Sequence, residues 1–336
     1  MGNMLRLGII GCGRVTTMFH LKAIEEVEEV TVEAVSDVSE DRIRDVLGSC
    51  ASAKAYTHYT DLLGDPDVDA VAINTPPRFH EEMVLSALSH GKHVLCEKPL
   101  AQTVEGCRRI GAAQREAGLQ VLPAHNYAFT PSVVRMAELV RQGTVGDVER
   151  MQVYFENNLR IYRSQTGFRT SSENGLVEDV LPHILSVSTP IAGRAREVKD
   201  LAWWCRQYKV CDNIKATLET EAGAEIDCSL SWTRLVPRFK VAVRGTGGNM
   251  ETDIMMSPYT VTIEKNGHRE TIRERGVDWY LDLIRFKHPS FQSQYRHFAR
   301  IVSGLEQPLI TVDDEAAILG LMEKMSGLLK EVPMSG

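Results

Sequence analysis

A glycine turn near the amino terminus has the residue types and spacing needed to bind a pyrophosphate. Gly11-Cys12-Gly13-Arg14-Val15-Thr16 follows a short apolar run and precedes a stretch with helical spacing. Gly11 permits a tight turn. Gly13 lets an anion approach the backbone, where the first N–H groups of a helix are free and its dipole end is positive. Thr16 stands where a third glycine is usual. An ordinary glycine turn fits the same six residues, so the surrounding elements must distinguish it from a pyrophosphate-binding turn.

Asp37 is a second group suited to a nucleotide, because it follows the apolar run Val30–Ser36 directly. A carboxylate at the end of this second strand accepts hydrogen bonds from both ribose hydroxyls of adenosine and repels a 2′-phosphate. The sequence therefore favours NAD over NADP as the cofactor, although Arg42 nearby leaves room for NADP. Asp37-Val38-Ser39-Glu40 also suits the start of a helix, and one carboxylate can serve both purposes.

The elements around these residues alternate between strand and helix. Apolar runs predict short strands, and the stretches between them have helical spacing. This alternation predicts an α/β fold with a parallel sheet covered by helices on both faces, as in a Rossmann fold. The expected strands are Leu5–Ile10, Val30–Ser36, Ala70–Asn74, His93–Cys96 and Gln120–Pro123, and the expected helices are Thr16–Glu26, Glu40–Cys50, Phe79–His90 and Val104–Ala117.

After about residue 150 the pattern changes to strands joined by short turns. Turn signals such as Glu221-Ala222-Gly223 and Asn266-Gly267 predict hairpins, and therefore a mostly antiparallel sheet. A chain of 336 residues exceeds what one core usually supports, so we expect two domains, 1–124 and 125–336. The expected strands of the second domain are Met151–Glu156, Ala216–Glu221, Glu225–Thr233, Lys240–Gly245, Tyr259–Lys265 and Arg269–Arg273, and its expected helices are Gln292–Ser303 and Asp313–Lys330.

Composition and charge exclude several classes of function. The formal net charge of −7 argues against a nucleic-acid partner. No apolar run approaches the roughly 20 residues of a membrane helix, and the first residues lack the apolar core of a signal peptide, so we expect a cytoplasmic protein without a membrane partner. The seven cysteines are odd in number and include no Cys-x-x-Cys pair, which indicates neither a disulfide framework nor a zinc site.

A further set of motifs resembles the Gfo/Idh/MocA (glucose–fructose oxidoreductase/inositol dehydrogenase) family. The resemblance implies a Rossmann domain that binds NAD or NADP, followed by an α/β domain on a large open sheet that binds substrate and assembles dimers or tetramers. It implies a sugar, cyclitol or sugar derivative as substrate, with nucleotide-linked sugars included. The motifs are Asn74-Thr75-Pro76-Pro77-Arg78-Phe79-His80, Gly91-Lys92-His93-Val94, Glu97-Lys98-Pro99-Leu100, His125-Asn126-Tyr127, Gly143-Thr144-Val145-Gly146, Gly175, and the pair Asp179 and His183.

The resemblance also assigns roles to single residues. Lys98, Asp179 and His183 fall on the family's catalytic positions. Ala128, Asn174 and Leu181 depart from the family pattern near the substrate, so they bear on substrate identity rather than on fold. The glycine turn, Asp37 and the family motifs together give the residues expected at the cofactor: Gly11, Gly13, Arg14, Val15, Asp37, Asn74, Thr75, Pro76, His80, Glu97, Lys98 and Asn126.

The implied chemistry is the oxidation of a secondary alcohol, which requires hydride transfer to nicotinamide and removal of the hydroxyl proton. A histidine suits proton removal because its pKa lies near neutrality. His183 follows Pro182, and proline is tolerated in the first turn of a helix. We therefore expect His183 in a first turn, where the dipole favours the neutral base. Asp179 would orient His183, cap the helix or bind a substrate hydroxyl. Lys98 would supply positive charge where alkoxide character develops.

A basic stretch lies ahead of this helix and supplies candidates for substrate binding. Arg160, Tyr162, Arg163 and Arg169, together with Tyr127, would bind a phosphate, a carboxylate or a nucleotide-sugar. A solvated loop that pairs with acidic residues across a subunit contact fits the same side chains.

Two other functions remain compatible with the sequence. A redox-neutral enzyme would oxidise a sugar transiently, epimerise it or eliminate from it, and reduce it again with tightly held NAD. A regulator would sense NAD without catalysis, but this role requires neither a base nor a lysine. The presence of both Lys98 and His183 favours an enzyme over a regulator.

Overall fold

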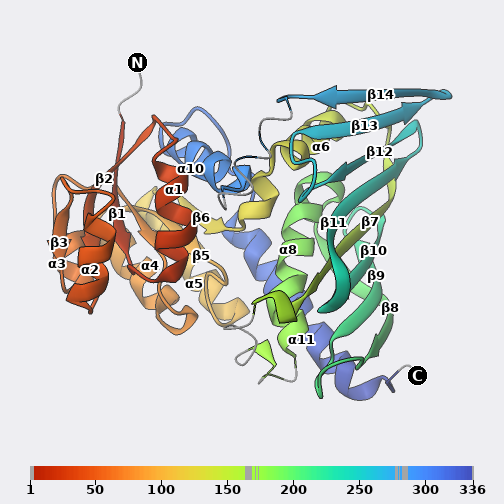
Figure 1. Ribbon diagram of the computed structural model, residues 1–336, viewed down its shortest axis with the longest axis horizontal. Helices are drawn as coiled ribbons and strands as arrows, with labels where there is room; N and C mark the ends of the chain where they lie inside the picture. Colours follow the sequence, from red (N-terminus) through yellow and green to blue (C-terminus); the bar gives the residue numbers. More distant parts are fainter. Residues whose placement is uncertain are drawn as a thin grey trace. The chain divides into compact units, whose positions relative to one another are not determined.

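A computed structural model describes residues 4–162, 169–170, 172, 174–276, 279, 281 and 287–334, without the side chains of residues 161 and 162. The chain divides into two compact units. Unit 1 comprises Met1–Phe129 and Val277–Ala316, and unit 2 comprises Thr130–Gly276 and Ala317–Gly336. Each unit is built on its own sheet (Figure 1). No helix in the described part of the chain has the length and hydropathy of a membrane span.

Unit 1 contains a six-stranded parallel sheet with the strand order β3-β2-β1-β4-β5-β6. Strands β1, β4, β5 and β6 are almost continuously buried and apolar, as expected of a parallel sheet covered on both faces. The strands are β1 (Leu5–Ile10), β2 (Val30–Ser36), β3 (Lys54–Tyr56), β4 (Ala70–Ile73), β5 (His93–Glu97) and β6 (Val121–Ala124). The helical elements are η1 (Thr16–His20), α1 (Leu21–Ile24), α2 (Glu40–Leu47), α3 (Tyr59–Leu63), η2 (Pro77–Phe79), α4 (His80–Ser89), α5 (Val104–Ala117), η3 (Asn126–Phe129) and α10 (Pro289–Val302).

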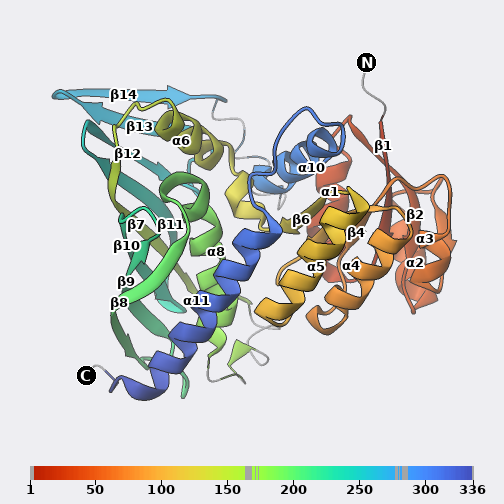
Figure 2. The same cartoon turned by 180° about the vertical axis from the view of Figure 1, so that it is seen from behind.

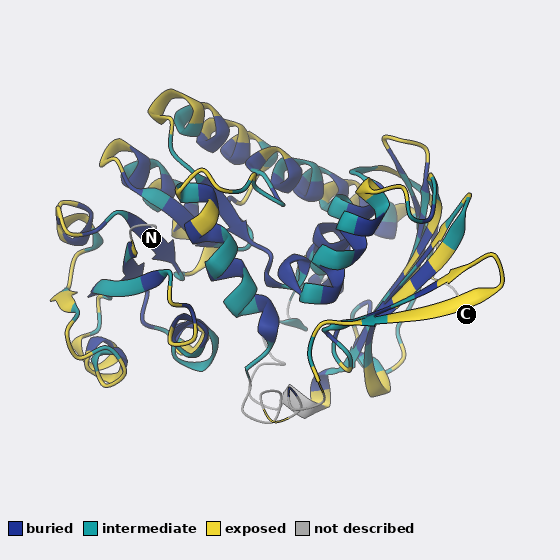
Figure 3. Cartoon of the chain, turned by 90° about the horizontal axis from the view of Figure 1, so that it is seen from above, coloured by how far each residue is buried: buried dark blue, intermediate teal, exposed yellow. Residues whose placement is uncertain are grey.

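Local capping explains where helix α5 of unit 1 begins and ends. The Thr103 side chain accepts a hydrogen bond from the Gly106 N–H at 3.0 Å at the start of α5, and Gly118 ends that helix in a left-handed conformation with φ +65°. The predicted helix Thr16–Glu26 takes another form, because a π-helical turn, η1, precedes the short helix α1. In Figure 3, helices of the chain are coloured as buried on one side and exposed on the other.

Unit 2 contains an eight-stranded sheet with the order β14-β13-β12-β11-β7-β10-β9-β8. Its neighbouring strands are antiparallel except for the parallel pair β7 and β10, and helix α8 packs on β7 and β10 (Figures 1 and 2). The strands are β7 (Val148–Asn158), β8 (Ala195–Trp204), β9 (Asn213–Thr220), β10 (Glu225–Ser231), β11 (Thr233–Gly245), β12 (Gly248–Asp253), β13 (Thr260–Lys265) and β14 (His268–Arg273). The helical elements are α6 (Pro131–Arg141), η4 (Leu159–Tyr162), α8 (Gly175–Ala192) and α11 (Val312–Glu331), which continues from unit 1.

The two sheets confirm the predicted fold class, a Rossmann fold followed by an α/β unit on a large, mostly antiparallel sheet. The division at 1–124 and 125–336 did not anticipate that Val277–Ala316 belongs to unit 1. Helix α10 explains why this later segment belongs to unit 1, because its side chains Tyr295, Phe298 and Ile301 are buried in the same core as Leu21 and Ile24. An amphipathic pattern shows that a helix has a buried face, but not which sheet covers that face.

Candidate active site

The glycine turn after β1 places two glycines in different surroundings. Gly11 has φ +97°, and a Cβ atom there would lie 2.7 Å from the carbonyl oxygen of Asn74, so the fold itself requires glycine. A Cβ atom at Gly13 would meet no protein atom within 4 Å. The protein therefore has no steric need for glycine at residue 13, and the space in front of this backbone is free for a ligand.

Thr16 occupies the third glycine position and closes the turn by hydrogen bonding. Its hydroxyl donates to the carbonyl oxygen of Gly11 at 2.6 Å and accepts from the Asn74 amide at 3.2 Å. The side chain is fully buried. A side chain at this position is thus tolerated because its polar atom is satisfied, and the helix begins there with the π-helical turn η1.

The glycine turn opens on a cleft of about 1020 Å³ in unit 1, which is large enough for a cofactor. The predicted cofactor residues that line it are Gly11, Gly13, Arg14, Val15, Asp37, Asn74, Thr75 and Pro76. Sequence reasoning missed a second group of lining residues, which follow β3 or lie in η2 and the first turn of α4: Thr57, His58, Tyr59, Arg78, Phe79, Glu82 and Met83. The three-residue strand β3 is mostly exposed and has no apolar pattern, so the only signal for the first of these was its place in the sheet.

Asp37 fastens the glycine turn to the start of α2. One carboxylate oxygen accepts the Cys12 backbone N–H at 2.8 Å, and the other accepts that of Ser39 at 2.9 Å. Ser39, not Asp37, is the N-cap of α2. Each carboxylate oxygen keeps a further lone pair for a ligand hydroxyl. The Arg42 guanidinium lies 3.8 Å from Asp37 and is 60% exposed.

The turn after β5 carries Glu97 and Lys98. Burial opposes ionisation of Glu97, but a hydrogen bond from His20 and the charges of His20 and Lys98 outweigh it, so the pKa of Glu97 is lowered. The buried His80 ring contacts the carbonyl oxygens of Pro99 and Thr75, each at 2.7 Å. His80 does not line the cleft among the residues described there. Instead it ties one lining residue, Thr75, to the turn that carries Lys98.

Asn126 and Tyr127 lie in η3, directly after β6. The Asn126 amide donates to the Ser290 hydroxyl of α10 at 2.9 Å, and the Tyr127 ring packs edge-on against His288 with centroids 5.5 Å apart. In a parallel sheet the carboxyl ends of neighbouring strands meet at one edge. η3 therefore follows β6 at the edge where β5 ends in Glu97.

In unit 2, Asp179 and His183 lie on α8, one turn apart and on the same side of the helix. The prediction that His183 lies in a first turn is wrong, because α8 begins at Gly175 and runs through Pro182. Burial of its apolar residues against the sheet keeps the helix intact at the proline. The dipole of the helix end therefore does not act on His183. Its ring packs instead on Phe155 of β7, with centroids 5.5 Å apart.

Asp179 forms an ion pair with Arg169, whose Nε lies 2.9 Å from the carboxylate. Both side chains are about one-fifth exposed. A capping role for Asp179 is excluded, since the N-cap of α8 is Asn174. Of the other basic-stretch residues, Arg160 is exposed in η4, the side chain of Tyr162 is not described, and Arg163 lies outside the described residues.

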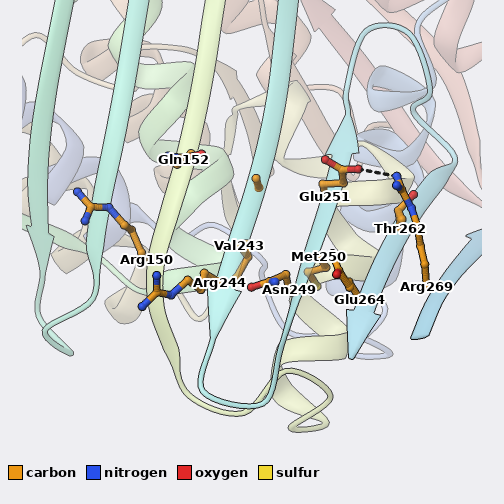
Figure 4. A pocket seen from close by; sticks show the side chains of 11 residues that line it. Arg150, Gln152, Val243, Arg244, Asn249, Met250, Glu251, Thr262, Glu264 and Arg269 are labelled. Atoms are coloured by element: carbon orange, nitrogen blue, oxygen red, sulfur yellow. Dashed lines mark hydrogen bonds and ion pairs between the residues drawn. The ribbon is translucent and has the colours of Figure 1, made fainter. Parts of the chain in front are cut away.

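Figure 4 shows a second hollow, which lies on the sheet of unit 2 and is lined by residues of β7, β11, β12, β13 and β14. Side chains alternate between the two faces of a strand. Phe155 faces α8, so Met151 and Val153 share its face, whereas Arg150 and Gln152 point the other way, into the hollow. The hollow is thus on the face of the sheet opposite His183.

Two family profiles match the chain over most of its length. The profile described as an oxidoreductase family with an NAD-binding Rossmann fold matches residues 5–125, and the GFO/IDH/MocA C-terminal domain matches residues 133–251. The trans-1,2-dihydrobenzene-1,2-diol dehydrogenase of Bos taurus is 30% identical over 273 residues, which is 79% of each chain. This chain belongs to the Gfo/Idh/MocA oxidoreductase family. The predicted family and its NAD-binding Rossmann fold are thereby confirmed.

Two further relatives agree with this assignment. The myo-inositol 2-dehydrogenase of Thermotoga maritima is 32% identical over 142 residues, and the match spans only 42% of either chain. The crystal structure of a probable dehydrogenase from Thermotoga maritima has a TM-score of 0.80 and 23% identity, with 97% of each chain covered. The latter shows that this Gfo/Idh/MocA protein shares the fold over nearly its whole length.

Proposed function

We propose that this Gfo/Idh/MocA protein is an NAD-dependent dehydrogenase that oxidises a secondary alcohol of a sugar, a cyclitol or a related ring. The observation that carries the proposal is the free space in front of Gly13, in a cleft that also contains Asp37. A glycine that the fold does not require is explained by a pyrophosphate that approaches its backbone. The bound NAD would supply a hydride acceptor.

The relatives support a substrate with hydroxyl groups on a six-membered ring. One of them acts on myo-inositol and another on a trans-dihydrobenzenediol, by their names. Both substrates carry neighbouring hydroxyls on a six-carbon ring. Such a ring is small, so its recognition depends on a few polar side chains, for which Asp179 with Arg169 in unit 2 is the candidate pair.

In the proposed mechanism, side chains of this protein remove the substrate's hydroxyl proton and stabilise the negative charge on its oxygen. His183 takes the hydroxyl proton on a ring nitrogen, and the aromatic packing of Phe155 limits its rotation. Lys98 stabilises the negative charge that develops on the substrate oxygen. Asp179, held by Arg169, binds a neighbouring substrate hydroxyl or orients His183. Asp37 holds the adenosine ribose, which favours NAD over NADP.

The test is steady-state reduction of NAD, followed by NADH absorbance, with a panel of cyclitols, sugars, nucleotide sugars and a trans-dihydrodiol. Lys98→Ala and His183→Ala should each lower kcat by about 10²–10⁴-fold, the usual range for an acid–base group. In His183→Ala the dissociation constant of NAD should stay within twofold, because His183 belongs to unit 2 and the cleft to unit 1. High pH should restore part of the loss in His183→Ala but not in Lys98→Ala.

The exposed His90 at the end of α4 provides a matched control, and His90→Ala should leave kcat unchanged. Normal turnover in His183→Ala at neutral pH would reject the assigned base. NAD that copurifies with the protein, without any net reduction of added NAD, would instead support the redox-neutral alternative.

We also propose that the protein works in the cytoplasm as a homo-oligomer that assembles through the sheet of unit 2. The face with the hollow of Figure 4 bears an array of charged side chains that already pair with each other, such as Arg269 with Glu251 at 3.0 Å. Because this face carries charges of both signs, the same face of a second copy could meet it across a twofold axis. Light scattering on the purified protein should give a dimer or tetramer mass, and a monomer would reject this proposal.

A further inference from the structure

A buried chain of hydrogen bonds connects the turn of Lys98 with helix α10. The His20 ring contacts the Glu97 carboxylate through Nε2 at 3.0 Å and the Tyr295 hydroxyl through Nδ1 at 2.7 Å. His20 and Tyr295 are both fully buried. The second oxygen of Glu97 accepts the backbone N–H of Lys98 at 3.3 Å. All four residues belong to unit 1.

The proton positions in this chain follow from the ionisation of its two ends. The pKa of Glu97 is lowered, so its carboxylate only accepts, and Nε2 of His20 must donate to it. Burial and the charge of Glu97 raise the pKa of Tyr295 well above its ordinary value, so the phenol keeps its proton beside Nδ1. The His20 ring therefore joins Tyr295 to Glu97 and donates to the carboxylate through Nε2.

The π-helical turn η1 carries His20 as its last residue and so sets the direction of this side chain. A π turn shifts side chains around the helix axis relative to an α-helix, and such turns are rare. This one begins at Thr16, whose buried hydroxyl is bound to Gly11. The irregular turn thus separates the glycine turn from a histidine that must face the end of β5.

Two further buried contacts hold the residues after Lys98. His80 contacts the carbonyl oxygen of Pro99 at 2.7 Å, and the N–H of Leu100 donates to Glu315 at 3.0 Å. Glu315 also pairs with the buried His125. Side chains of α4 and α11 therefore hold the backbone that follows Lys98, and Glu97 places a negative charge directly before the lysine.

We propose that His20 is a positioning residue that keeps Glu97 from neutralising Lys98. Without the bond to His20, the Glu97 carboxylate is free to turn and pair with the Lys98 ammonium. That pair would remove the positive charge that the substrate oxygen needs and would shift the turn. The proposal rests on the proposed catalytic role of Lys98, and it assigns to His20 and Tyr295 no contact with substrate or cofactor.

A matched pair of variants separates the two contacts of His20. A glutamine amide can take the place of Nε2 and still donate to Glu97, whereas an asparagine amide reaches only the place of Nδ1. We expect His20→Asn to lower kcat by about 10–10²-fold, the order of loss caused by a misplaced catalytic group, with the KM for NAD within twofold. His20→Gln should retain most of the turnover.

The decisive measurement repeats His20→Asn in a Lys98→Ala background. A residue that acts through Lys98 causes no further loss of kcat once the lysine is absent. If His20→Asn lowers kcat by the same factor in both backgrounds, it does not act through Lys98, and the proposal is overturned.

A readout that needs no cofactor is hydrogen exchange of the turn, measured by mass spectrometry on the peptide containing residues 97–100. The amides of Lys98 and Leu100 should exchange faster in His20→Asn than in wild type or His20→Gln. Unchanged exchange would overturn the proposal. If Lys98→Ala turned over normally, the proposed function would fail, while exchange would still report on the turn. Should His20→Asn not fold, Tyr295→Phe removes one hydroxyl and should change exchange in the same direction.

Discussion

Replacement of Gly13 by alanine tests whether the space in front of its backbone belongs to a pyrophosphate. An added Cβ atom meets no protein atom within 4 Å, and the backbone there does not have a positive φ. The substitution should therefore leave the free energy of unfolding unchanged or raise it by about 0.4–1 kcal/mol, because alanine restricts the unfolded chain. We expect no other effect of the substitution on the folded protein without cofactor.

The affinity for NAD should fall sharply in the same variant. A methyl group at residue 13 keeps the phosphate from the backbone N–H groups and removes at least one charge-assisted hydrogen bond, worth about 1.5–3 kcal/mol. This corresponds to an increase in the dissociation constant of roughly 10–150-fold. Titration calorimetry with NAD and thermal unfolding without it measure the two effects separately.

Two other glycines serve as controls for Gly13→Ala. Gly11→Ala should lower the free energy of unfolding by about 1–3 kcal/mol, because Gly11 has φ +97° and its added Cβ would lie 2.7 Å from the Asn74 carbonyl oxygen. Gly327→Ala lies in α11 with open space around it and should leave NAD binding unchanged. A Gly13→Ala protein that binds NAD within twofold of wild type would refute the placement of the pyrophosphate.

Two further predictions concern carboxylates of unit 1. Asp37→Ala should leave kcat nearly intact but weaken NAD binding. It should also reduce the preference for NAD over NADP, because Arg42 is then the remaining charge near the ribose. An unchanged ratio of the two dissociation constants would contradict this. The pKa of Glu315 is lowered from its ordinary value of 4.5, since the charge and hydrogen bond of His125 outweigh burial. Its stabilising contribution is therefore present at neutral pH and is lost as the pH falls through the folded-state pKa, below 4.5. Glu315→Gln should lower the free energy of unfolding by about 3 kcal/mol at pH 7. It should also make that free energy fall less steeply at acid pH. Denaturant titrations that show the same loss of stability at acid pH as in wild type would contradict this.

Features set by a few adjacent residues were predictable from the sequence alone. The Asn266-Gly267 pair predicts a hairpin, and both residues have positive φ, +52° and +75°, between β13 and β14. Strand β1 and helix α5 have the predicted bounds, because an unbroken apolar run and a Thr103 cap with a Gly118 end define them locally. The glycine turn and Asp37 likewise line one cleft, as their spacing along a strand–turn–helix implies.

The neighbours of the proposed catalytic groups were decided only by tertiary structure. His183 lies inside α8 and not at its start, because burial of apolar residues on the sheet carries the helix through Pro182. His20 meets Tyr295 across 275 positions of sequence, and Glu315 meets His125 across 190. Such pairs depend on which sheet a helix covers and in which rotation. An amphipathic pattern specifies that a helix is buried on one side, whereas the partner on that side is chosen by packing of the whole core.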